Sequence, residues 1–368
     1  MLGLWLLALL HVYIGWRIAP QLPAPLAVAG FVALLLTTAS LIPVAFAGRR
    51  VRDRSVADRW TWVGMLALGL FAILLVLTLL RDLVLLAAWP FALPPLAAPT
   101  AVAVPVLAAL ALAWGLAGAR RTARVRHVDV PIAGLPAALH GFTIAQISDI
   151  HVGPTVKRAY LQAIVDTVNR LDADAVAITG DLVDGRVADL RDDVAPLAGL
   201  RAREGAFFVT GNHEYYSGAD EWIAQLRTLG LRVLNNEHVL IERGDARLVL
   251  AGVTDHSAHH FDPRERSDPR RALAGAPADA ALRVLLAHQP RSAAAAAEAG
   301  FDAQLSGHTH GGQIWPFNFF VPLQQPFTAG LHRLGSMWIY VSRGTGYWGP
   351  PLRLGAPSEI TRLRFVAA

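Results

Sequence analysis

The chain has 368 residues, of which 54% are hydrophobic and 17% charged, whereas soluble domains carry roughly 25% charged residues. This apolar composition excludes an intrinsically disordered protein. The absence of cysteine excludes a disulfide scaffold, a zinc–thiolate site, an iron–sulfur cluster and a cysteine nucleophile. Residues 1–119 hold only seven Arg and three Asp of the chain's 33 basic and 28 acidic residues. The sequence therefore predicts a membrane region followed by a water-soluble region.

Residues 1–119 are predicted to form a transmembrane region of about four helices. Four apolar stretches each approach the ~20 residues that a spanning helix needs. They are Leu2–Ala19, Leu26–Ala47, Trp60–Leu80 and Thr100–Gly118. A signal peptide is the alternative for the first stretch, but no basic segment precedes its apolar run. Prolines interrupt Leu83–Ala98, which we expect to be a loop at the membrane interface with Trp89 as its anchor.

Arginine residues gather on one side of these predicted helices, and Arg17 and Arg81 are the arginines on the other side. The clustered residues are Arg49, Arg50, Arg52, Arg54, Arg59, Arg120, Arg121, Arg124 and Arg126. The positive-inside rule therefore predicts a protein of the cell (inner) membrane with its C-terminal region on the cytoplasmic face. Residues 120–127 are predicted to be a basic juxtamembrane linker, and the helices to be a membrane anchor.

The remaining residues, 128–368, are predicted to form one catalytic domain of the α/β class. Short apolar runs of strand length alternate with stretches in which apolar residues recur at helical spacing. The predicted strands are Phe142–Ser148, Asp174–Thr179, Gly205–Thr210, Arg247–Gly252, Arg283–Ala287 and Ala303–Ser306, and the predicted helices are Val156–Leu171, Ala219–Leu229 and Ser292–Ala299. Residues 127–368 carry 22 basic and 25 acidic residues, so we expect no nucleic-acid partner. The sequence indicates no protein partner.

Polar side chains follow five of these strands at the point where each strand ends. They are Asp149, His151, Asp181, Asp184, Asn212, His213, His288, His308 and His310. Ligands of open α/β sheets bind outside the carboxyl ends of the strands, so we expect these residues to share one site. Carboxylate, amide and imidazole donors without thiolates suit Mn, Fe or Zn. A set of this size fits two divalent ions, which can activate water for displacement at phosphorus without a Ser or Cys nucleophile.

The order DxH, GDxxD, GNH[ED], a single His and GHxH resembles the calcineurin-like metallophosphoesterase superfamily. Three further sequence motifs resemble a bacterial, often membrane-associated branch of this superfamily. They are Gly307–Ile314 (GHTHGGQI), Tyr340–Ser342 (YVS) and Gly344–Arg353 (GTGYWGPPLR). That branch includes YkuE-like and YaeI-like phosphodiesterases and some UDP-2,3-diacylglucosamine pyrophosphatases. The resemblance covers about Val128 to the C-terminus, and the transmembrane half is not part of the common pattern.

The resemblance implies a four-layered αββα sandwich and a dinuclear metal centre. One metal would be held by Asp149, His151, Asp181 and His310, and the other by Asp181, Asn212, His288 and His308. The resemblance further implies that His213 stabilises or protonates the leaving oxygen, while Asp184 orients its ring. Glu214 completes the third motif, with a structural and a catalytic role both open.

The resemblance and the composition together predict a membrane-anchored hydrolase of a phosphoester or pyrophosphate bond. The apolar segment Ile314–Leu323 follows the last His pair, and both a packed loop and a surface that contacts lipid are open for it. Together with the resemblance to the membrane-associated branch and the predicted anchor, the segment favours an amphiphilic, lipid-linked substrate. Asp255–His260 is expected to be a polar loop lining the cleft, and Trp348 and Arg353 are candidates for contact with a headgroup phosphate. The alternatives are a phosphodiesterase for soluble nucleotides that is only tethered to the membrane, and a non-catalytic metal-binding scaffold.

Overall fold

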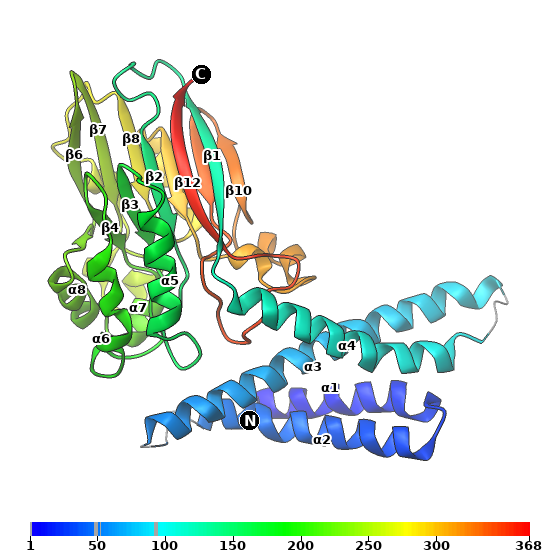
Figure 1. Cartoon of the computed structure of the whole chain (residues 1–368). Coiled ribbons are helices and arrows are strands. Elements are labelled where there is room, and N and C mark those ends of the chain that lie inside the picture. Colours follow the sequence, from blue (N-terminus) through cyan, green and yellow to red (C-terminus); the bar gives the residue numbers. More distant parts are fainter. Residues whose placement is uncertain (1, 48–50, 52, 92–94) are drawn as a thin grey trace. The chain divides into compact units, whose positions relative to one another are not determined.

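The computed structural model describes residues 2–47, 51, 53–91 and 95–368 of the chain. The chain divides into two compact units. The helical unit comprises Met1–Arg120 together with Gly349–Leu354, and the α/β unit comprises Arg121–Trp348 together with Gly355–Ala368. Both units are visible in Figure 1, where the N-terminal helices of the helical unit are coloured blue to teal. A short segment near the C-terminus thus belongs with the N-terminal helices.

The helical unit contains four helices that are long and apolar enough to cross a membrane. They are α1 (Leu2–Ile18), α2 (Pro25–Ala47), α3 (Arg54–Ala88) and α4 (Ala97–Arg120), with 3-10 turns η1 (Ala19–Gln21) and η3 (Trp89–Phe91). Asp53 caps the N-terminus of α3 by accepting hydrogen bonds from the N–H groups of Ser55 and Val56. The four predicted apolar stretches are therefore confirmed as helices.

The predicted interfacial loop Leu83–Ala98 is wrong at both ends, because α3 continues through Ala88 and α4 begins at Ala97. Leu, Val and Ala before Pro90 are compatible with a helix, and the chain leaves helical geometry only where the prolines begin. Prolines within α2 and α4 are tolerated as well. Part of the predicted loop, and Arg49, Arg50 and Arg52 of the predicted cytoplasmic cluster, lie outside the described residues.

The α/β unit is built on two six-stranded sheets. The first has the order β1-β12-β2-β3-β4-β5: Arg124–Ile132, Glu359–Ala367, Thr143–Ile147, Ala175–Thr179, Ala206–Val209 and Arg232–Val233. The second has the order β10-β11-β9-β8-β7-β6: Gly330–Leu334, Met337–Val341, Ala303–Ser306, Leu282–Leu286, Ala246–Gly252 and Glu237–Arg243. Strands β2 to β5 run parallel, as do β7, β8, β9 and β11. The carboxyl ends of these parallel strands carry the loops with the predicted site residues.

The two sheets pack face to face, because Ile144 and Phe207 of the first share one buried core with Leu250 and Val284 of the second. Helices α5 (Arg158–Asn169), α6 (Val187–Val194), α7 (Asn212–Ser217) and α8 (Ala219–Thr228) lie beside the first sheet (Figure 1). Helices α9 (Pro269–Ala272) and α10 (Ala293–Ala299) contribute to a second core with the other sheet. The 3-10 turns of this unit are η4 (Ala195–Gly199), η5 (Ala258–His260), η6 (Pro263–Glu265), η7 (Pro290–Ser292), η8 (His310–Gly312), η9 (Phe317–Phe319) and η10 (Val321–Leu323). The expected αββα sandwich is confirmed.

The segment 120–127, predicted as a linker, has regular structure over most of its length. Helix α4 ends at Arg120 and strand β1 begins at Arg124, where it pairs in parallel with β12. Arg124 and Arg126, two of the arginines that suggested a membrane flank, are exposed side chains of the edge strand β1, and charge at an edge discourages pairing with another chain.

Candidate metal centre

The loops after the parallel strands bring the predicted site residues together at one end of the two sheets. Three groups of described side chains have ligand atoms that all lie within 4.8 Å of one another. The first contains Asp149, His151 and His310, the second contains Asp181, His288 and His308, and the third contains His151, Asp184 and His213. The six residues of the first two groups come from four loops far apart in the sequence, so the expected convergence is observed.

The first group places two imidazoles and a carboxylate around one point. The Nε2 atoms of His151 and His310 are 3.1 Å apart, and Asp149 Oδ1 lies 3.5 Å from His310 Nε2. At this distance one ring nitrogen can donate its proton to the other, or the lone pairs of both can face a shared cation.

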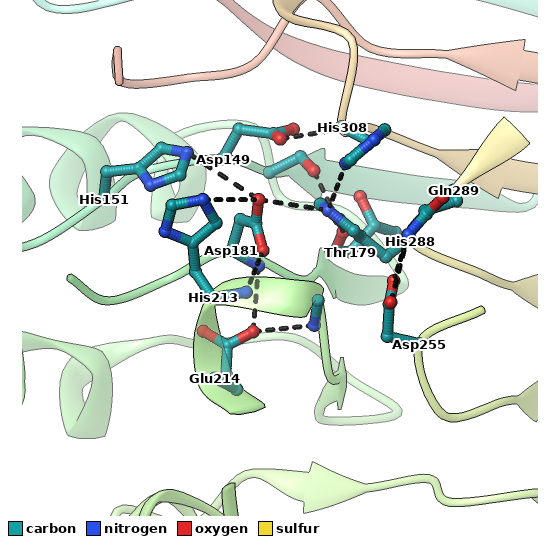
Figure 2. A network of polar contacts seen from close by, with 12 residues as sticks. Asp149, His151, Thr179, Asp181, His213, Glu214, Asp255, His288, Gln289 and His308 are labelled. Carbon is teal, nitrogen blue, oxygen red and sulfur yellow. Dashed lines mark hydrogen bonds and ion pairs between the residues drawn. The ribbon is translucent and has the colours of Figure 1, made fainter. Parts of the chain in front are cut away.

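The second group repeats this arrangement, and Asp181 connects the two (Figure 2). His288 Nε2 lies 3.1 Å from His308 Nδ1 and 3.1 Å from Asp181 Oδ2. The same Asp181 oxygen is 3.9 Å from His151 Nε2 in the first group. One carboxylate oxygen thus faces both groups, a position from which Asp181 could bridge two bound cations.

Two polar atoms at the site have no partner within the part of the chain that the structure describes. Asp149 Oδ2 and Asn212 Oδ1 are buried and accept no hydrogen bond. A buried orphan oxygen is costly unless an ion or water satisfies it. Asn212 directly precedes His213, whose backbone N–H donates to Asp181 Oδ1 at 2.9 Å. These orphans show that the donor set fits bound cations.

The backbone at this site is held in an unfavourable conformation. Five of the predicted ligands have left-handed φ angles: Asp149 (53°), His151 (56°), Asp181 (50°), His308 (71°) and His310 (51°). Residues other than glycine rarely adopt this region, and strain of this kind gathers at functional sites. Here it turns each side chain from the end of a strand toward the common point.

Comparison with known proteins agrees with this geometry. Residues 142–312 match the calcineurin-like phosphoesterase family. An uncharacterized metallophosphoesterase of Aquifex aeolicus is 35% identical over 240 residues, which are 64% of this chain and 89% of that protein. The chain belongs to the calcineurin-like metallophosphoesterase family.

Two further relatives are similar to this chain. The uncharacterized metallophosphoesterase YkuE of Bacillus subtilis is 31% identical over 62% of this chain and 80% of its own length. A "Transmembrane protein with metallophosphoesterase domain" of Bos taurus is 43% identical over 74% of this chain. The match spans 64% of that bovine protein, which is less than two thirds of its length.

Asp184 orients two rings of the metallophosphoesterase site at once. Its Oδ1 accepts hydrogen bonds from Nδ1 of His213 at 2.6 Å and from Nδ1 of His151 at 3.0 Å. Because a carboxylate only accepts, both rings must carry a proton on Nδ1 and turn Nε2 toward the ligand cluster. His213 Nε2 lies 4.0 Å from Asp181 Oδ2. His288 is oriented in the same way, since its Nδ1 donates to the Thr179 carbonyl at 2.7 Å.

The charges of the cluster compensate one another in the metal-free protein. Burial alone would raise the pKa of Asp181, but the charge of His288 holds it well below its usual range. His288 correspondingly has a pKa well above its usual value, against the effect of burial. Burial, followed by the charge on His288, lowers the pKa of His308 to about 3, which leaves its ring neutral. Burial raises the pKa of Asp149. A cation bound here would displace the proton on His288.

Glu214 has a structural role that the sequence left open. Its carboxylate is buried and accepts hydrogen bonds from the N–H groups of Asp181 (3.0 Å), Leu182 (2.8 Å) and Gly211 (2.7 Å). Burial, followed by the charge of Asp181, raises the pKa of Glu214 to about 7. Glu214 therefore connects the loop after β3 to the start of α7. In the sequence, the glutamate of the GNHE motif was the feature that pointed to this residue.

Several contacts around the site were not predicted. Asp255 is buried and accepts hydrogen bonds from Gln289, the residue after His288 (Figure 2), so the start of the predicted cleft loop is packed. The Trp348 ring lies 5.7 Å from the His213 ring, which supports its expected position at the cleft. Arg353 is only 3% exposed and lies in the segment that joins the helical unit, which argues against the expected contact with a headgroup.

Proposed function

We propose that the protein is a membrane-anchored, dinuclear metal-dependent hydrolase of a phosphoester or pyrophosphate bond. Asp181 carries this proposal, because its Oδ2 faces both ligand groups. One divalent ion (Mn, Fe or Zn) would be held by Asp149, His151, Asp181 and His310. The second would be held by Asp181, Asn212, His288 and His308. Two ions in these positions supply an activated water and a binding site for phosphoryl oxygens.

His213 provides the proton that the reaction needs at the leaving oxygen. Burial works against protonation of this ring, but the hydrogen bond to Asp184 and the charge of Asp181 raise its pKa to about 9. The ring is therefore protonated at neutral pH, and its Nε2–H points toward the cluster while Nδ1 is held by Asp184. A group that only stabilised bound metal would need neither this proton nor this orientation, which counts against a scaffold.

The substrate that we propose is amphiphilic, with a phosphate group and a lipid portion. The aromatic loop, defined as Ile314–Leu323, exposes Trp315 (41%), Phe319 (66%) and Leu323 (80%) directly after the ligand His310. It is held to Trp348 by two hydrogen bonds through Gln313, and Trp348 in turn contacts His213. An apolar surface that begins at the ligand cluster suits acyl chains of a lipid whose phosphate occupies the cluster.

The test is an activity screen of the full chain, loaded with Mn²⁺, Fe²⁺ or Zn²⁺, in detergent micelles. Substrates are p-nitrophenyl phosphate, bis-p-nitrophenyl phosphate, a nucleotide pyrophosphate and an acylated phosphodiester. We expect the acylated substrate to be preferred and its rate to follow its surface concentration in the micelle. A rate that does not depend on the surface concentration of the substrate in the micelle indicates a soluble nucleotide substrate. The absence of hydrolysis with every substrate indicates a non-catalytic scaffold.

A matched pair of variants tests the role of the aromatic loop. Phe319→Ser removes an exposed ring from the loop, whereas Leu240→Ser removes an apolar side chain that is 44% exposed on β6. We expect Phe319→Ser alone to raise the apparent KM for the acylated substrate, with little change for bis-p-nitrophenyl phosphate. Equal effects of both variants would contradict a specific contact between the loop and lipid.

A further inference from the structure

The ligand cluster is built from loops of both sheets, so its geometry depends on how the two sheets pack at this end. Asp149 follows β2 and Asp181 follows β3, and both strands belong to the first sheet. His288 follows β8 and His308 follows β9, and both strands belong to the second sheet. His288 Nε2 lies 3.1 Å from Asp181 Oδ2, and the N–H of His308 donates to Asp149 Oδ1 at 2.8 Å. A small shift between the sheets would therefore separate both pairs.

Gln146 of β2 forms a hydrogen-bonded link between the two sheets, three residues before Asp149. Its side chain is fully buried, and strand alternation places it on the same face as Ile144, which belongs to the core shared by both sheets. The Nε2 atom of Gln146 donates to Thr179 Oγ1 of β3 at 2.8 Å and to the carbonyl of Ser306 in β9 at 2.9 Å. The first bond stays within the first sheet, whereas the second bond crosses to the other sheet.

Both residues that accept from Gln146 lead directly to a ligand of the second group. The carbonyl of Thr179 accepts the hydrogen bond from Nδ1 of His288 at 2.7 Å (Figure 2). Ser306 ends β9 two residues before His308. Apolar contacts have no preferred direction, whereas a hydrogen bond fixes a distance and an angle. The amide of Gln146 therefore sets how far the support of His288 lies from the strand that carries His308.

The amide of Gln146 is not explained by the stability of the core. Its Oε1 is buried and has no hydrogen-bond partner among the described residues. An apolar side chain of the same size would fill this position without such an oxygen, and a buried oxygen that has lost its hydrogen bonds to water is unfavourable. The benefit of the amide must therefore come from its two N–H groups, which hold Thr179 and Ser306.

We propose that Gln146 is a positioning residue of the metal centre. It holds the two sheets at the separation at which His288 and His308 meet Asp181 around one cation, and it acts through Thr179 and Ser306. This inference rests on the metal binding that we propose for the protein, but not on the hydrolysis.

The test compares Mn²⁺ binding by the full chain in detergent micelles with and without Gln146→Met. Methionine fills a similar volume but cannot donate to Ser306. We expect the affinity for one of two Mn²⁺ ions to fall by about 10- to 100-fold, as it does when a group that orients metal ligands is removed. At limiting Mn²⁺ the variant should hold one ion per chain, and the EPR signal of a coupled Mn²⁺ pair should give way to that of an isolated ion.

Gln304→Met is the matched control. Gln304 of β9 is also fully buried, and its Oε1 likewise has no hydrogen-bond partner within the described chain. Its Nε2 donates to Ser306 Oγ at 2.9 Å, a bond that stays within β9. Ala303 and Leu305 belong to the shared core, so Gln304 faces away from the first sheet. We expect both Met variants to change the melting temperature by similar amounts, and only Gln146→Met to change Mn²⁺ binding.

Gln146→Asn guards against a folding failure of Gln146→Met. Its amide is one methylene group shorter and cannot reach Thr179 and Ser306 together, so Mn²⁺ binding should weaken in the same way. Unchanged Mn²⁺ affinity in the Gln146 variants, or an equal loss in Gln304→Met, would refute the positioning role. A wild-type chain that binds no Mn²⁺ pair would overturn the proposed metal centre and this inference together. If the wild-type chain binds the pair but hydrolyses no substrate, only the proposed hydrolysis fails, and the Mn²⁺ affinities still decide the role of Gln146.

Discussion

Replacement of Asp184 by Asn perturbs the shared support of His213 and His151 without removing a predicted metal ligand. The carboxylate accepts from both Nδ1 atoms through one oxygen, at 2.6 and 3.0 Å. An amide is uncharged and has one acceptor oxygen, so it can retain a hydrogen bond but not the charge that favours protonated His213. The variant should therefore lower the pKa of His213 and weaken the orientation of both rings.

The size of the effect follows from the pKa of His213. The hydrogen bond to Asp184 leads the interactions that raise this pKa from 6.5 to about 9, against the effect of burial. If the pKa returns to about 6.5, the protonated fraction at pH 8 falls from about 90% to about 3%, a loss of about 30-fold. At pH 6 both proteins keep most of this proton, and the loss is only about 1.3-fold. Bound cations lower the pKa in both proteins, which moves both curves to lower pH and keeps their order.

The assay is kcat against pH for wild type and Asp184→Asn, with metal content measured in the same samples. We expect the variant to lose activity at lower pH than wild type as pH rises, because a general acid must be protonated. Asp189→Asn, which removes an exposed carboxylate paired with Arg186, is the matched control and should follow the wild-type profile. A uniform loss at every pH, with the alkaline limb unmoved, would refute the assignment of His213 as the proton donor.

Three further outcomes are expected. Asp181→Asn should abolish activity and lower metal content at both sites, and full activity of the metal-loaded variant would contradict bridging. His213→Ala should keep its metals and slow turnover by ~10²–10⁴, so loss of metal would show that the ring is a ligand instead. An enzyme reporter fused after Ala368 should be active in the cytoplasm, whereas a periplasmic signal would reverse the predicted orientation.

The ligand cluster could be anticipated from sequence because parallel strands deliver their carboxyl ends to one edge. Each short apolar run followed by Asp, Asn or His identified one loop, and the structure brings Asp149, Asp181 and His308 together as this rule requires. The apolar stretches were recognisable for a similar reason, since a run of about 20 apolar residues has few other interpretations. In both cases a local pattern determines a feature of the fold.

Contacts between segments far apart in sequence could not be anticipated in this way. The bond from Asp184 to His151 joins two loops, and nothing in either loop shows that one oxygen serves two rings. The assignment of Gly349–Leu354 to the helical unit was missed because two prolines and a leucine have no distinct periodicity. The C-terminal end of α3 was predicted too early. The prolines that follow Ala88 led to the prediction of a loop over the whole of Leu83–Ala98, although the residues up to Ala88 are helical.

Contacts between loops constrain which residues can occupy the motifs, even though the sequence alone does not identify those contacts. Two glycines of the motifs, Gly211 and Gly307, show this constraint. A Cβ at Gly211 would lie 2.2 Å from Asp181 Oδ1, and one at Gly307 would lie 2.2 Å from Asp149 Oδ2. Each glycine therefore precedes its own site residue and, at the same time, admits the carboxylate of another loop. The G of GNH and the G of GHxH are required by Asp181 and Asp149, because any side chain there would push a carboxylate out of the ligand cluster.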